Sequence, residues 1–136
     1  MRVVLDTNIL ISALISSTGN PAAIYDAWED GKFILLTCTE HLHELRATLQ
    51  KPRIAGLIKP YSAGRLVNQI KRFAEDVGPL PRVIRSPDPN DDFLLAMSEA
   101  GKANYLVTGD KCGLLSLHRH KATQIVSATS FSSLFA

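Results

Sequence analysis

Several acidic residues stand where predicted strands end or a predicted helix begins, and these positions bring side chains to the edge of an α/β sheet. They are Asp6 after the apolar run 2–5, Asp110 after the apolar run 105–107, and Asp91 and Asp92 just after Asp88-Pro89. Carboxylates within about 5 Å of each other repel, so they bind protons or share a cation. All-oxygen sites prefer hard cations, so Mg²⁺ or Mn²⁺ is the expected ion, and metal-assisted hydrolysis of a phosphodiester is the matching chemistry.

Each of these acids also has a purely structural explanation. Asp88 before a proline is a good helix N-cap, Asp91 fits a capping partner in the first turn, and Asp92 favours the helix dipole. Asp6 and Asp110 could serve as turn residues after their strands. Their shared placement, rather than any single residue, supports a functional site.

The elements that would position these acids alternate between strands and helices. Strands are predicted over 2–5, 33–36, 105–108 and 123–126, with a brief one at 83–84. Apolar residues at helical spacing and capping residues predict helices over about 7–15, 20–30, 39–50, 62–77, 88–100 and after 127. This alternation predicts an α/β fold, with one domain over 1–136 and a mostly parallel sheet of about four or five strands between two helical layers.

The distribution of basic residues along the chain fits a protein that binds a polyanion. The chain has 136 residues and a formal net charge of +2, yet no acid occurs from Leu45 to Ala74, where seven basic residues stand. Such a stretch suits a nucleic acid, although ordinary solvated helix faces would also explain it. No apolar run approaches the length of a membrane span, so we expect a cytoplasmic protein.

Three motifs in this order resemble the PIN-domain family of ribonucleases, and within it the VapC-like toxin components of prokaryotic toxin-antitoxin systems. The motifs are Asp6-Thr7-Asn8 after a strand, Asp88-Pro89-Asn90-Asp91-Asp92 heading a helix, and Thr108-Gly109-Asp110 after another strand. The resemblance spans essentially the whole chain. It implies a metal-dependent endoribonuclease acting on RNA with Mg²⁺ or Mn²⁺, with a cognate antitoxin and a homodimer among the expected partners.

The resemblance also implies particular site residues. It adds Glu44, which the helical pattern alone would place on a solvent-facing surface, and it makes Asp6, Glu44, Asp110 and either Asp91 or Asp92 the metal ligands. Asn8 and Thr108 would hold carboxylates or water by hydrogen bonds. RNA-backbone contacts are expected from Arg46, Lys51, Arg53, Arg65, Lys111 and Arg119.

Other functions remain as alternatives. A haloacid-dehalogenase phosphatase would need Asp-x-Asp after the first strand, and a phospho-receiver would need an aspartate after a middle strand, so neither pattern matches. A PIN scaffold that binds RNA or protein without cutting is the remaining alternative. It is suggested by Lys111-Cys112, where family members often carry another acid after Thr-Gly-Asp.

Overall fold

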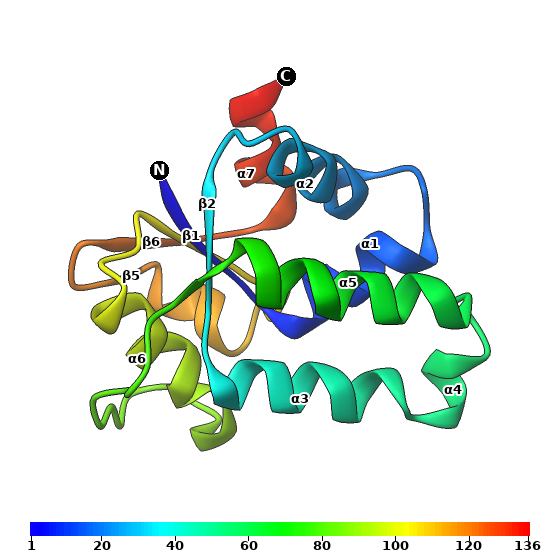
Figure 1. The fold of residues 1–136 in the computed structure, drawn as a ribbon. Helices are drawn as coiled ribbons and strands as arrows, with labels where there is room; N and C mark the ends of the chain where they lie inside the picture. Colours follow the sequence, from blue (N-terminus) through cyan, green and yellow to red (C-terminus); the bar gives the residue numbers. More distant parts are fainter.

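The computed structural model describes residues 1–136 and contains one six-stranded sheet, whose strands gather on the left in Figure 1. The strand order is β3-β2-β1-β4-β6-β5, and all neighbours are parallel except β5, which runs antiparallel to β6. The strands are β1 (Arg2–Leu5), β2 (Ile34–Thr37), β3 (Glu75–Asp76), β4 (Tyr105–Val107), β5 (Arg119–His120) and β6 (Thr123–Val126). β1 and β4 are therefore adjacent in the middle of the sheet.

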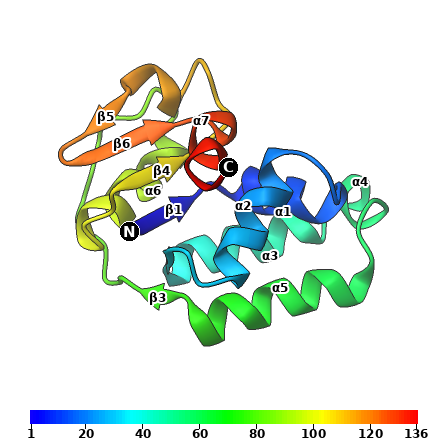
Figure 2. The same cartoon turned by 90° about the horizontal axis from the view of Figure 1, so that it is seen from above.

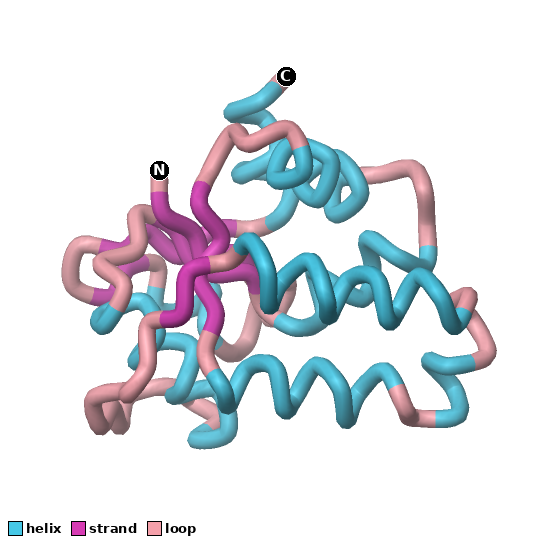
Figure 3. The backbone as a smooth tube through the Cα atoms, viewed as in Figure 1, coloured by secondary structure: helices cyan, strands magenta, loops and turns pink.

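Seven α-helices surround the sheet. They are α1 (Thr7–Ile15), α2 (Asn20–Glu29), α3 (Thr39–Leu49), α4 (Pro52–Ala55), α5 (Pro60–Phe73), α6 (Asp92–Ala100) and α7 (Ala128–Ser132), with 3₁₀ turns η1 (Pro89–Asp91), η2 (Leu114–Leu117) and η3 (Ser133–Phe135). Figures 2 and 3 show the strands gathered together, while α3 and α5 extend away from them and are joined through α4. None of the helices has both the length and the apolar character needed to cross a membrane.

Two apolar cores, one on each face of the sheet, hold these layers together. β1 supplies both, because Val3 and Leu5 belong to one core while Val4 belongs to the other, as the twofold alternation of a strand requires. The larger core receives side chains from α1, α2, α3, α5 and α7, and the smaller one is filled mainly by α6 and η2. The predicted α/β class, with helices on both faces of a mostly parallel sheet, is confirmed.

Some predicted boundaries were wrong. The sheet has six strands rather than four or five, because β3 and β5 are pairs of residues that show no strand pattern in sequence. The helix predicted over 62–77 ends at Phe73, where the chain turns extended and β3 pairs with β2. Residues 83–84 are not a strand; Val83 is instead half-buried against the smaller core.

Helix α3 carries a histidine inside the protein. His41 is 4% exposed, its Nε2 atom has no hydrogen-bond partner, and its ring lies 5.8 Å from that of Phe93. Burial disfavours the charged imidazolium and lowers the pKa of His41 from 6.5 to about 4. The folded state therefore binds fewer protons than the unfolded state between these two values, so acidification destabilises it.

We predict that His41 makes folding acid-sensitive. As pH falls from about 6.5 through about 4, the wild-type protein should lose about 3 kcal/mol of unfolding free energy through this residue. His41→Leu should remove that part of the pH dependence, measured by urea unfolding at pH 7 and pH 4.5. His43→Leu, at an exposed position of the same helix, is the control; a parallel pH dependence of His41→Leu and wild type would contradict the prediction.

Candidate active site

A polar cleft of about 560 Å³ opens at the carboxyl ends of β1 and β4, and no apolar side chain lines it. Its lining consists of Asp6, Thr7, Asn8, Glu44, Thr48, Lys51, Asp88, Asp91, Gly109 and Asp110. The acids come from the end of β1, from α3, from η1 with its cap and from the loop after β4. The fold thus brings to one place residues that are more than a hundred positions apart in sequence.

Asp6 is the innermost of these acids. It is 8% exposed, its backbone N–H donates to the Val107 carbonyl (2.9 Å), and its Oδ2 accepts a 2.8 Å hydrogen bond from the hydroxyl of buried Thr108. Burial raises the pKa of Asp6, the Thr108 hydrogen bond opposes the rise, and the charge of Glu44 adds to it. Thr108 therefore fixes this carboxylate, whereas the exposed side chain of Asn8 lines the cleft without a hydrogen bond of its own.

Glu44 reaches the cleft from α3, on the side of the helix away from the Leu45 core position. The Thr7 hydroxyl donates to Glu44 Oε1, and the Thr48 hydroxyl one turn later donates to the Glu44 carbonyl (2.9 Å). Sequence reasoning missed Thr7 as a supporting residue, although it lies within the Asp6-Thr7-Asn8 motif. The direction of a side chain in the first helical turn cannot be read from periodicity, so no signal singled Thr7 out.

Asp110 lines the cleft from the exposed loop after β4. Its Oδ1 accepts a hydrogen bond from the backbone N–H of Gly113 (3.0 Å), which turns the carboxylate back onto its own loop. A Cβ atom at position 113 would lie 2.1 Å from Asp110 Oδ2. Only glycine at this position leaves room for the Asp110 carboxylate in that orientation.

The two neighbouring candidates at the start of α6 have different environments. Asp91 lines the cleft, whereas Asp92 does not; its Oδ1 accepts hydrogen bonds from the backbone N–H groups of Arg85 (3.1 Å) and Ser86 (2.7 Å). Asp88 also lines the cleft, but its Oδ1 caps η1 by accepting from the Asn90 N–H (3.0 Å). The geometry thus separates Asp91, a residue of the cleft, from Asp92, which holds the preceding loop.

Burial and the neighbouring acids of the cleft make the carboxyl of Asp91 harder to ionise. Burial raises the pKa of its carboxyl to about 6, and the charges of Asp6, Asp88, Asp110 and Glu44 contribute to the rise. Below about pH 6 the Asp91 carboxyl keeps its proton, and above that pH the ionised group is repelled by its neighbours. A cation in the cleft would relieve this repulsion directly.

The donor set fits a hard divalent cation. Its acids offer only oxygen, which Mg²⁺ and Mn²⁺ prefer. No three His, Cys, Asp or Glu side chains are grouped closely enough to hold an ion among themselves directly. Mg²⁺ is usually bound through one or two carboxylates and keeps several waters, so such a site needs no closed protein cage. Asp6, Glu44, Asp91 and Asp110 are the residues that would hold the ion directly or through water.

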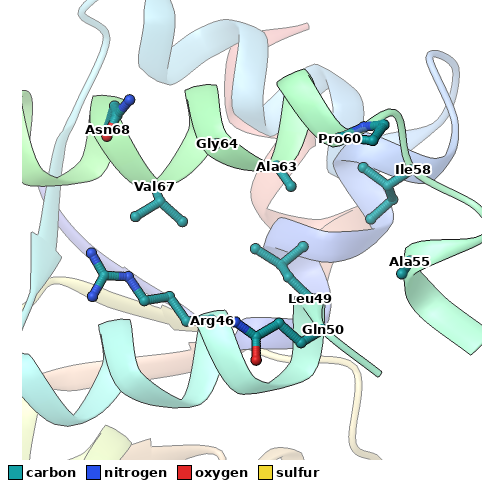
Figure 4. Close-up of a pocket in the computed structure, with 10 residues that line it drawn as sticks. All are labelled: Arg46, Leu49, Gln50, Ala55, Ile58, Pro60, Ala63, Gly64, Val67 and Asn68. Carbon is teal, nitrogen blue, oxygen red and sulfur yellow. The ribbon is translucent and has the colours of Figure 1, made fainter. Parts of the chain in front are cut away.

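The predicted RNA-contacting residues are spread over the surface. Lys51 lines the cleft, Lys111 directly follows Asp110, and Arg53 lies in α4 two residues beyond Lys51. Arg46 projects instead into a separate groove of about 520 Å³ between α3 and α5 (Figure 4). Arg65 on α5 pairs with Glu29 at 3.3 Å, and Arg119 lies on the edge strand β5. Of these six residues, only Lys51 lines the cleft.

Comparison with known families identifies the family to which this fold belongs. A family model described as PIN domain matches residues 2–112, a span that includes every acid of the cleft, and the chain belongs to this family. A search of curated proteins found no match. PIN domains are typically nucleases, so the family indicates a hydrolase that acts on a nucleic acid. PIN nucleases generally use divalent metals.

We predict that Asp91 and Asp92 differ in their contribution to metal binding. Asp91→Asn should weaken Mn²⁺ binding by at least about tenfold, because it removes a charged oxygen from the cleft. Asp92→Asn keeps the Oδ1 acceptor for the Arg85 and Ser86 amides, so its Mn²⁺ affinity should stay within about twofold of wild type. Electron paramagnetic resonance of free Mn²⁺ measures both affinities, and an equal loss in the two variants would contradict this assignment.

We further predict that Thr7 acts through its hydroxyl. Thr7→Val keeps the shape of the buried side chain but removes the donor to Glu44, so it should weaken Mn²⁺ binding by about tenfold. Thr7→Ser retains the donor and should bind Mn²⁺ nearly as wild type does. Calorimetric titration of the two variants provides the comparison, and equal affinities for Val and Ser at this position would argue against the role.

Proposed function

We propose that this chain is a divalent-metal-dependent endoribonuclease. The observation that carries the proposal is the cleft in which Asp6, Glu44, Asp91 and Asp110 converge at the carboxyl ends of β1 and β4, lined by no apolar side chain. The family match, to a group whose members are typically nucleases, supports the same reaction class. Cleavage of RNA rather than DNA rests on the resemblance to PIN ribonucleases.

The residues of the chain have distinct roles in this proposal. A bound Mg²⁺ or Mn²⁺ would lower the pKa of an attacking water and stabilise charge on the phosphoryl group. Thr108 and Thr7 keep Asp6 and Glu44 oriented, and the Gly113 N–H does the same for Asp110. Lys51 is the positively charged residue that lines the cleft. Its ammonium group can bind an RNA phosphate, which the surrounding carboxylates would otherwise repel.

The resemblance to VapC-like proteins extends the proposal to a toxin of a toxin-antitoxin pair. The polar, acid-lined cleft supports an antitoxin that covers it and presents a basic residue to its carboxylates. A homodimer is part of the same proposal. Copurification of the chain with the product of a neighbouring gene would identify such an antitoxin.

We predict that the purified protein cleaves labelled single-stranded RNA with Mn²⁺ or Mg²⁺ and that chelation abolishes cleavage. Asp6→Asn and Asp110→Asn should each lower the rate by at least about a hundredfold, because each removes a charged ligand oxygen. Asp30→Asn, an exposed carboxylate at the end of α2, is the matched control and should cleave as wild type does. Single-stranded DNA of the same sequence tests the preference for RNA.

The competing function is a non-catalytic PIN scaffold. The scaffold would be favoured, and catalysis refuted, if the wild-type protein bound RNA but left several RNAs intact with either ion. In that case wild type and Asp6→Asn would behave alike. Cleavage that survives chelator would refute metal dependence alone.

A further inference from the structure

The segment that carries Asp88 and Asp91 into the cleft has no regular secondary structure between β3 and η1. On its inner side, Leu80 and Val83 pack against the smaller apolar core. Burial is the main cause of the raised pKa of Asp91, and repulsion by four other carboxylates of the cleft adds to it. That repulsion pushes the segment away from the cleft, so something must hold it in place.

One hydrogen-bonded network fixes this segment just before Asp88. Asp92 Oδ1 accepts from the backbone N–H groups of Arg85 and Ser86, which ties the segment to the first residue of α6. The Arg85 side chain extends from the segment to β5. Its Nη1 donates hydrogen bonds to the carbonyl of Arg119 (2.8 Å) and to Nδ1 of His120 (2.7 Å), both residues of β5. Arg85 therefore connects the segment with the edge strand of the sheet.

The same network also reaches the other end of α6, through a contact between His120 and Glu99. His120 is 6% exposed, and its Nε2 lies 2.6 Å from Glu99 Oε2 near the end of α6. Because Nδ1 accepts from Arg85, the neutral ring carries its proton on Nε2 and donates it to Glu99. Lys121 Nζ occupies the other Glu99 oxygen at 2.7 Å. Both ends of α6, the segment and β5 are thus joined in one circuit of hydrogen bonds.

We propose that Arg85 is a positioning residue for the cleft: through His120 and the Asp92-capped backbone it holds the segment that places Asp91 among the other carboxylates. The inference rests on the proposed function, since it concerns the ability of the cleft to bind a divalent cation. Arg85 has no carboxylate partner in the network. Its two acceptors are a backbone carbonyl and a buried ring, which are fixed by the fold rather than mobile in solvent.

The expected effect concerns metal affinity rather than the chemical step. When Arg85 is removed, repulsion moves Asp91 outwards in the metal-free protein, and the binding ion must bring it back at a cost in affinity. With an ion bound, the same residues would hold it in the variant as in the wild type. High metal concentration should therefore restore the maximal rate, whereas a general loss of folding would not be rescued in this way.

The test compares Arg85→Ala with Ser86→Ala. Ser86 is the matched control because its Oγ has no hydrogen-bond partner and its backbone N–H to Asp92 survives the substitution. Arg85→Ala should raise the Mn²⁺ dissociation constant by about tenfold or more, measured by electron paramagnetic resonance of free Mn²⁺. Its RNA cleavage rate at saturating Mn²⁺ should stay within about twofold of wild type, and Ser86→Ala should match wild type in both measurements.

The outcomes separate this inference from the proposed function. Unchanged Mn²⁺ affinity in Arg85→Ala, with wild type binding Mn²⁺, overturns the positioning role and leaves the nuclease proposal intact. A loss of rate that saturating Mn²⁺ does not restore also overturns the role. Absence of Mn²⁺ binding by wild type overturns the proposed function and this inference with it. Circular dichroism at the assay temperature establishes that each variant is folded.

Discussion

Repulsion among carboxylates gathered at one edge of the sheet is the constraint on which the rest of the site depends. The parallel order of β1 and β4 brings Asp6 and Asp110 to the same edge, and α3 and η1 add Glu44 and Asp91. Folding has to hold these charges together without the help of a counter-charge from the core. The pKa of Asp91 is raised mainly by burial, and the charges of the neighbouring carboxylates add to the rise.

The structure meets this constraint by giving three of these four acids a separate neutral donor, whereas the Asp91 side chain makes no capping hydrogen bond. Thr108 serves Asp6, Thr7 serves Glu44 and the Gly113 amide serves Asp110. Hydroxyl and amide donors orient a carboxylate without neutralising it, so the negative potential of the cleft survives. A lysine or arginine in the same positions would satisfy the carboxylates and remove their capacity to hold a cation.

Much of the fold and part of the site could be predicted from the sequence, for physical reasons that particular residues illustrate. The apolar run before Asp6 and the one before Asp110 predict buried strands, and parallel strands place both acids at one edge. Glu44 could be placed only through the family resemblance, because its direction depends on how α3 packs. Asp91 ends the three-residue 3₁₀ turn η1 and Asp92 begins α6, and no sequence signal marks this boundary between them. Two-residue strands such as β5 depend wholly on tertiary pairing.

The two chain termini lie far from the cleft, at the opposite edge of the sheet. Met1 precedes the start of β1, and Phe135 packs its ring 5.8 Å from that of Phe33, just before the start of β2 (Figure 1). The acids of the cleft follow the ends of β1 and β4 instead. An affinity tag or a fluorescent protein fused at either terminus therefore leaves the mouth of the cleft clear, so surface immobilisation through either end keeps the site accessible.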